Sequence, residues 1–228
     1  MLRGFIMKNH VKPFLAGTVL CLAYANSSFA TFIDTTSFAY NQALSVSGNN
    51  QVALTFTTGP SGPFNINDLK FNLFSNSGIL GPKVFASLRN VDAAFNPTGA
   101  DLVSETLHPG NLSAGVASLQ DFNTLGVLGS FNLGANTNYA LVLSGGSSDL
   151  YWSYSHDTTA PITGNGFTVL KPGTKSADSG TSWTLAGTGA VIMSMSGTST
   201  DIPEPSTFGL FGMGLVLLAF AKPLKVKI

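Results

Sequence analysis

The chain has 228 residues, as many basic as acidic residues, and a formal net charge of zero at pH 7. Only 10% of its residues are charged, against roughly 25% in an ordinary soluble domain. The sequence contains no basic patch with interleaved aromatic residues, and this argues against nucleic acid as a partner.

The first 30 residues have the three parts of a secretory signal peptide. A basic region without any acidic residue precedes an apolar core, Phe14–Ala25. Ser28 and Ala30 then place small residues at the two positions that signal peptidase recognises before a cleavage site. We therefore expect signal peptidase to remove residues 1–30, so that the exported chain begins at Thr31.

The body of the chain, residues 31–200, has a length that suits one domain. It carries five Lys or Arg and nine Asp or Glu residues, a net charge of −4. Cys21 is the only cysteine and lies in the segment that we expect to be removed. The exported body therefore has no disulfide, no thiol nucleophile and no cysteine-ligated metal, and its stability must come from packing.

Short stretches of the body alternate apolar and polar residues with period two, as half-buried strands do. Runs of Gly, Pro, Asn and Ser separate them, among them Lys171-Pro172-Gly173, which predicts a turn. The alternation predicts an all-β, antiparallel β-sandwich of jelly-roll type. The ten expected strands are Gln51–Thr57, Leu69–Ser75, Val84–Arg89, Leu102–Thr106, Val127–Leu133, Tyr139–Ser144, Leu150–Ser155, Gly166–Leu170, Ser182–Leu185 and Val191–Ser196.

Motifs of catalysis are missing from the body. It has no Gly-x-Ser-x-Gly elbow, His-Glu-x-x-His pair, phosphate-binding loop or calcium loop. His156 and Asp157 are interpreted as a solvated loop pair, because adjacent residues on a strand point to opposite faces. Asp101 and Glu105 are carboxylates of the kind that a glycosidase needs, but a sequence does not show their separation. We therefore expect a non-enzymatic protein without a cofactor or a metal.

Aromatic residues cluster at Tyr151, Trp152 and Tyr154 on one expected strand. Trp152 and Tyr154 share one face of a regular strand, and Tyr151 lies on the other. Exposed aromatic rings on a sandwich face can stack on sugars, so these three residues are candidates for glycan contact. In the alternative interpretation Trp152 and Trp183 are core residues, where their large apolar area stabilises most.

The last segment, residues 201–228, has three parts. Pro203 and Pro205 keep Glu204 in an extended stretch, because proline fits neither a helix interior nor a central strand. Phe208–Ala221 is apolar and spans about 21 Å as a helix, short of a hydrocarbon core of roughly 30 Å that flanking residues help to cross. Three lysines follow it and place this end in the cytoplasm.

This tail resembles the PEP-CTERM sorting signal of exported bacterial proteins, in which a Pro-Glu-Pro motif precedes a hydrophobic transmembrane helix and a basic cluster. Pro203, Glu204 and Pro205 match the motif residue by residue. Lysines spread around Pro223 replace the usual arginine cluster. The resemblance implies recognition by a membrane-embedded exosortase, transient anchoring in the inner membrane, and delivery to the cell surface or extracellular matrix.

The body resembles the choice-of-anchor type R domain of bacterial surface proteins, in Leu133–Gly145, Tyr151-Trp152, Ser182-Trp183 and the closing strand through Met195–Gly197. That family has no established activity. The two resemblances together imply a structural or adhesive protein of a Gram-negative bacterium, linked to extracellular polysaccharide or biofilm. The alternative is a secreted carbohydrate-binding module or carbohydrate-active enzyme with an unrecognised site.

Overall fold

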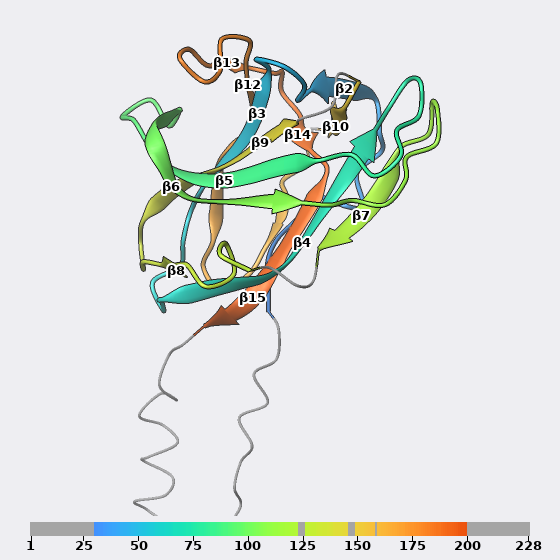
Figure 1. Ribbon diagram of the computed structural model, residues 1–228. Helices are drawn as coiled ribbons and strands as arrows, with labels where there is room; N and C mark the ends of the chain where they lie inside the picture. Colours follow the sequence, from blue (N-terminus) through green and yellow to red (C-terminus); the bar gives the residue numbers. More distant parts are fainter. Residues whose placement is uncertain (1–29, 123–125, 146–148, 158, 200–228) are drawn as a thin grey trace, which may run out of the picture.

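Two antiparallel sheets make up the computed structural model, which describes residues 30–122, 126–145, 149–157 and 159–199 (Figure 1). One sheet has the order β11 (Ile162–Thr163), β1 (Ala30–Asp34), β15 (Met193–Ser199), β4 (Phe64–Phe74), β10 (Tyr151–Ser155) and β14 (Ala190–Val191), with β2 (Gln42–Ser45) beside β10 and with β7 (Ser118–Phe122) and β8 (Asn132–Leu133) beside β4. The other has the order β13 (Thr184–Leu185), β12 (Thr168–Ser176), β3 (Gln51–Thr57), β9 (Asn138–Gly145), β5 (Val84–Val91) and β6 (Pro97–Leu107).

The expectation of an all-β, antiparallel structure is confirmed for the described residues. The jelly-roll connectivity stays a prediction. Within the described ranges no helix is long and apolar enough to cross a membrane. The expected transmembrane helix, Phe208–Ala221, lies outside the described residues.

One apolar core lies between the two sheets. Phe32 of β1 stacks on Phe167 with ring centroids 4.4 Å apart, and Phe167 stacks in turn on Phe56 of β3 at 5.9 Å. Phe167 thus links the nine-stranded sheet to the six-stranded sheet. Burial of such aromatic area is the main stabilising contribution available to a body without disulfides.

Two expected elements were wrong. Only Asn132–Leu133 of the expected strand Val127–Leu133 is a strand, and residues 127–130 form a turn instead. The Glu105 carboxylate accepts hydrogen bonds from the amides of Gly126 and Leu128 and so holds this turn. The expected turn at Lys171-Pro172-Gly173 lies inside β12, where the pairing with β3 is irregular, because proline cannot donate to a ladder.

The first and last described strands are neighbours. β1 pairs with β15 in antiparallel register, with Ala30 opposite Gly197. The start of β1 and the end of β15 therefore lie at the same end of the sandwich, as Figure 1 shows. Phe32 and Ile33 of β1 are fully buried, so this strand belongs to the core.

Asp149 fixes the turn that follows β4. Its carboxylate accepts hydrogen bonds from the Ser77 hydroxyl at 2.6 Å, the Ser77 amide at 2.7 Å and the Ser75 hydroxyl at 3.0 Å. These bonds, those of Ser77 first, lower the pKa of Asp149 to about 2. Because the ionised form accepts them, their stabilisation is present above the ordinary carboxyl pKa and lost as the pH falls through about 2.

We expect hydrogen exchange at the Ser77 amide to speed up, relative to its intrinsic rate, as the pH falls from about 4 to 2. Asp149→Asn should remove this pH dependence, because the amide side chain does not titrate. Nuclear magnetic resonance of the Asp149 carboxyl carbon gives the midpoint directly. A midpoint near 4 would contradict the assigned hydrogen bonds.

Candidate functional site

A hollow of about 270 Å³ lies on the outer face of the six-stranded sheet. The strand register builds it, because Gln51 of β3, Ser144 of β9, Phe85 of β5 and Thr106 of β6 are successive cross-strand neighbours. These side chains therefore form one row on the outer face. Ser87, also on β5, follows Phe85 at period two and lies opposite Ser104 of β6.

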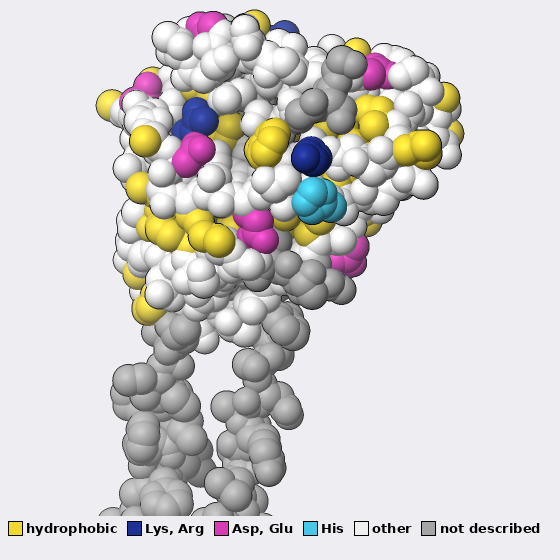
Figure 2. Space-filling model, in the orientation of Figure 1, with side chains coloured by type: hydrophobic (Ala, Val, Ile, Leu, Met, Phe, Trp, Pro, Cys, Tyr) yellow, Lys and Arg dark blue, Asp and Glu magenta, His cyan; other side chains and the backbone are white. Residues whose placement is uncertain are grey.

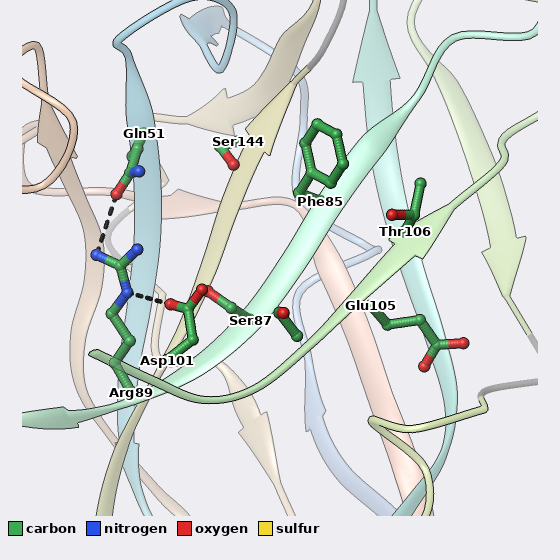
Figure 3. Close-up of a pocket in the computed structure, with 9 residues that line it drawn as sticks. Gln51, Phe85, Ser87, Arg89, Asp101, Glu105, Thr106 and Ser144 are labelled. Carbon is green, nitrogen blue, oxygen red and sulfur yellow. Dashed lines mark hydrogen bonds and ion pairs between the residues drawn. The ribbon is translucent and has the colours of Figure 1, made fainter. Parts of the chain in front are cut away.

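Arg89 supplies the basic group of the hollow and is held in place on two sides. Its Nε donates to Asp101 Oδ1 at 2.6 Å, and its Nη1 donates to Gln51 Oε1 at 3.2 Å, as Figure 3 shows. The loop after β12 packs against the contact between Arg89 and Gln51, since a Cβ on Gly180 would lie 2.6 Å from Gln51 Oε1 and 2.7 Å from Arg89 Nη1. The guanidinium is therefore preorganised rather than mobile.

Uncharged groups dominate the face around the hollow. Over β5 and β6, Figure 2 shows mostly polar uncharged side chains and backbone, with isolated basic and acidic groups between small apolar patches. Phe85 is 41% exposed although it lies within β5, as the second residue of that strand. Phe85 is thus an exposed aromatic ring inside a row of polar side chains.

Asp101 and Glu105 both border the hollow but do not form a catalytic pair. They are four residues apart on β6, which separates their Cα atoms by about 13 Å. The Asp101 carboxylate turns toward Arg89, whereas that of Glu105 points away from it (Figure 3). A glycosidase needs two convergent carboxyl groups roughly 5 to 9.5 Å apart, so this geometry does not support glycoside hydrolysis by these residues.

The three aromatic candidates are distributed over both faces of β10. Trp152 and Tyr154 are fully buried, so the prediction that they contact a glycan is corrected: the inward register of β10 places both rings in the core. Trp152 Nε1 donates to the Ile192 carbonyl at 3.0 Å. Tyr151 is half-buried on the outer face of the nine-stranded sheet, where its ring meets the edge of Phe74.

His156 and Asp157 do not act together. The Asp157 carboxylate accepts hydrogen bonds from the amide and the hydroxyl of Thr159, and these bonds lower the pKa of Asp157. The His156 amide donates to Asn41, and its ring lies edge-on to Tyr154. The arrangement is that of a loop pair on the exposed surface.

A charge cluster on β4 and β7 was not anticipated from the sequence. Lys70 Nζ lies 2.5 Å from Asp121 and 3.7 Å from Asp68. Burial raises the pKa of Asp68, whereas the hydrogen bond from Lys70 lowers that of Asp121. Opposed shifts of this kind occur at acid–base pairs, but here the lysine lies against both carboxylates and offsets one of their two negative charges, as in a structural ion cluster.

Phe85 was also missed, although the sequence contained a signal for it. In the expected strand Val84–Arg89 the apolar positions Val84, Ala86 and Leu88 face the core, so Phe85 falls in the polar register. An aromatic residue in that register predicts an exposed ring. Its neighbours Gln51 and Ser144 could not be found this way, because only the fold brings them to the same row.

The processing and sorting residues lie at the borders of the described chain. Ala30 begins β1, and Ser28 lies outside the described residues, as do Pro203, Glu204 and Pro205. Residues 201–222 match the family described as the PEP-CTERM protein-sorting motif. The chain carries a PEP-CTERM sorting motif. This motif supports export, transient attachment to the membrane and sorting by an exosortase.

The PEP-CTERM motif begins two residues after β15 ends, so the sorting segment follows the body directly. Among solved structures, the chain is similar to the cysteine protease and lectin-like domains of Cwp84, a surface layer associated protein of Clostridium difficile, with 13% sequence identity and a TM-score of 0.35. The similarity covers 67% of this chain and 33% of that one. No curated protein matches the chain in sequence.

Proposed function

We propose that the protein is a non-enzymatic surface or matrix component of a Gram-negative bacterium, structural or adhesive in role and associated with extracellular polysaccharide or biofilm. The PEP-CTERM motif at residues 201–222 is the observation that carries the proposal, since a sorting signal of this kind belongs to exported proteins. A signal peptide over residues 1–30, removed by signal peptidase, starts the route. A transmembrane helix over Phe208–Ala221 holds the chain in the inner membrane until exosortase acts.

The body suits a role at the surface. Its net charge of −4 is carried by few residues, and hydroxyl and amide groups supply most of its polarity. Such groups hydrogen-bond to a hydrated polymer without a strong long-range field. The start of β1 and the end of β15 lie at one end of the sandwich, so an attachment beyond residue 200 leaves the sheet faces accessible.

A choice-of-anchor type R body with jelly-roll connectivity is part of the same proposal.

The second candidate function, a carbohydrate-binding module, is favoured by one observation, the exposed Phe85 beside the preorganised Arg89. The two candidates are compatible, because an adhesive matrix protein can hold polysaccharide through such a module. A carbohydrate-active enzyme is less well supported, because the carboxylates of the hollow diverge.

We expect Glu204→Ala to leave the protein in the inner membrane. Position 204 comes after β15, the last described strand, so the change should leave the described fold intact while it removes the charge between the two prolines of the motif. Membrane fractionation followed by immunoblotting against the body measures the result. Deletion of everything after Thr200 should instead release a folded domain into the periplasm, because both the anchor and the signal are then missing.

Asp201→Ala is the matched control: it removes the same charge at the first residue of the matched segment, three residues earlier, and leaves the Pro-Glu-Pro motif complete. It should reach the surface in the same amount as the wild type. Normal surface delivery of Glu204→Ala would show that the tail is a plain membrane anchor and would refute sorting through this motif.

A further inference from the structure

We propose that the hollow on the six-stranded sheet binds one sugar unit of a neutral polysaccharide, with the ring of Phe85 as its platform. The inference deepens the proposed function and rests on it for the source of the ligand. It assigns a residue set to the contact with extracellular polysaccharide: Gln51, Phe85, Ser87, Arg89, Asp101 and Ser104.

The ring of Phe85 is the platform. An aromatic ring that stays in contact with water either serves to bind a partner or costs stability that the fold tolerates. Phe85 is 41% exposed near the start of β5, a strand paired on both sides, and the residues before and after it, Val84 and Ala86, are fully buried. The aliphatic C–H face of a pyranose can pack on such a ring and remove its apolar area from water. A polar partner without such a face would gain nothing from Phe85.

Hydrogen-bonding groups of suitable kind surround the platform. Four lining side chains carry hydroxyls, which both donate and accept hydrogen bonds as sugar hydroxyls do: Ser87, Ser104, Thr106 and Ser144. Arg89 is held by Asp101 and Gln51, so its donors are already oriented when a ligand arrives. A preorganised array lowers the entropic cost of binding.

The charge of the hollow selects against acidic polymers. Arg89 is its only basic lining residue among the described residues, whereas Asp101 and Glu105 are both acidic. The Arg89–Asp101 ion pair neutralises the guanidinium, and the body as a whole is negative. A uronate or sulfated chain would meet this field without a free basic group to offset it, so the structure favours a neutral sugar.

The size of the hollow indicates a weak, repeated contact. Its volume of about 270 Å³ is below the range of roughly 300 to 1,000 Å³ typical of sites that enclose a whole small ligand. It suits one unit of a longer polymer, and many copies displayed on one surface would add avidity. Another hollow, of about 310 Å³ between β2 and the β12–β13 hairpin, has Lys175 but no aromatic ring among its described lining residues.

The test uses the full chain, purified in detergent, and the exopolysaccharide of the producing bacterium separated by anion exchange into neutral and acidic fractions. Biolayer interferometry on each immobilised fraction gives the affinity. The wild type should bind the neutral fraction, and Phe85→Ala should weaken that binding roughly tenfold or more. Ser104→Trp, which places a large side chain of high strand propensity over the hollow, should weaken it as well.

Tyr40→Ala is the matched control. Tyr40 is 42% exposed, close to the 41% of Phe85, but it stacks on Phe74 of β4 on the nine-stranded side of the sandwich. It should bind the neutral fraction like the wild type, and near-ultraviolet circular dichroism checks that each variant is folded. Binding of the acidic fraction alone, of neither fraction, or of the neutral fraction equally by folded Phe85→Ala would overturn the proposal.

The glycan test and the sorting test with Glu204→Ala can fail independently. If the glycan test fails while the wild type is sorted normally, the glycan site is refuted and the surface location stands. If the sorting test fails while glycan binding is intact, sorting through the motif is refuted and the glycan site stands.

Discussion

Replacing Trp152 by alanine should lower the free energy of unfolding by about 3–5 kcal/mol, a large fraction of the roughly 5–15 kcal/mol that holds a typical domain folded. The side chain is fully buried and meets Phe71 edge-on, with ring centroids 5.2 Å apart. The Ile192 carbonyl that accepts from the indole also accepts from the Asn72 amide, so it keeps a partner in the variant. The cost is therefore mainly that of the cavity.

Urea unfolding of the body, residues 31–200, measures this loss. Tyr151→Ala is the control on the same strand, because Tyr151 is half-buried on the outer face and should cost clearly less. Equal losses for the two variants would mean that the register of β10 is reversed.

The second large effect is expected for Gly197→Ala in β15. A Cβ at this position would lie 1.9 Å from the Asn65 carbonyl oxygen of β4 and 2.8 Å from Phe32, so β15 must move away from its neighbours. Overpacking of this kind costs about 1–3 kcal/mol, and more where backbone is the obstacle. We expect a fall in melting temperature of about 2–4 °C for each kcal/mol lost, the sensitivity of a domain of this size, measured by circular dichroism.

Gly110→Ala is the matched control for this substitution. The nearest atom to a Cβ at Gly110 is the flexible end of the Gln120 side chain, at 3.3 Å, so the melting temperature should change little. An unchanged melting temperature for Gly197→Ala would show that β15 and β4 are not as close as the structure has them.

Local pattern was sufficient for most strands of the fold. The period-two alternation predicts β3 with both of its ends, Gln51 and Thr57, because that strand is regular. It failed at Val127–Leu133, where glycines favour a turn. Leu128 is buried there although it belongs to no strand. The alternation also left out β1, whose place is decided by its pairing with β15, more than 150 residues away in the sequence.

The site was less predictable than the fold, because it is made of non-local contacts. Alternation predicted that Trp152 and Tyr154 share one face of their strand. That face is buried only because the second sheet packs against it. The contact of Arg89 with Gln51 depends on the register between β5, β9 and β3. No property of single residues contains that information.

The position of β15 determines how the domain carries tension. An attachment beyond residue 200 pulls on Ser199 along the axis of a strand that is paired on both sides, with β4 and with β1. Hydrogen bonds of an antiparallel ladder run perpendicular to the strands, so this load shears many of them at once instead of opening them one by one. A shear-loaded terminal strand is the mechanically stronger geometry, and this would suit the matrix role proposed above.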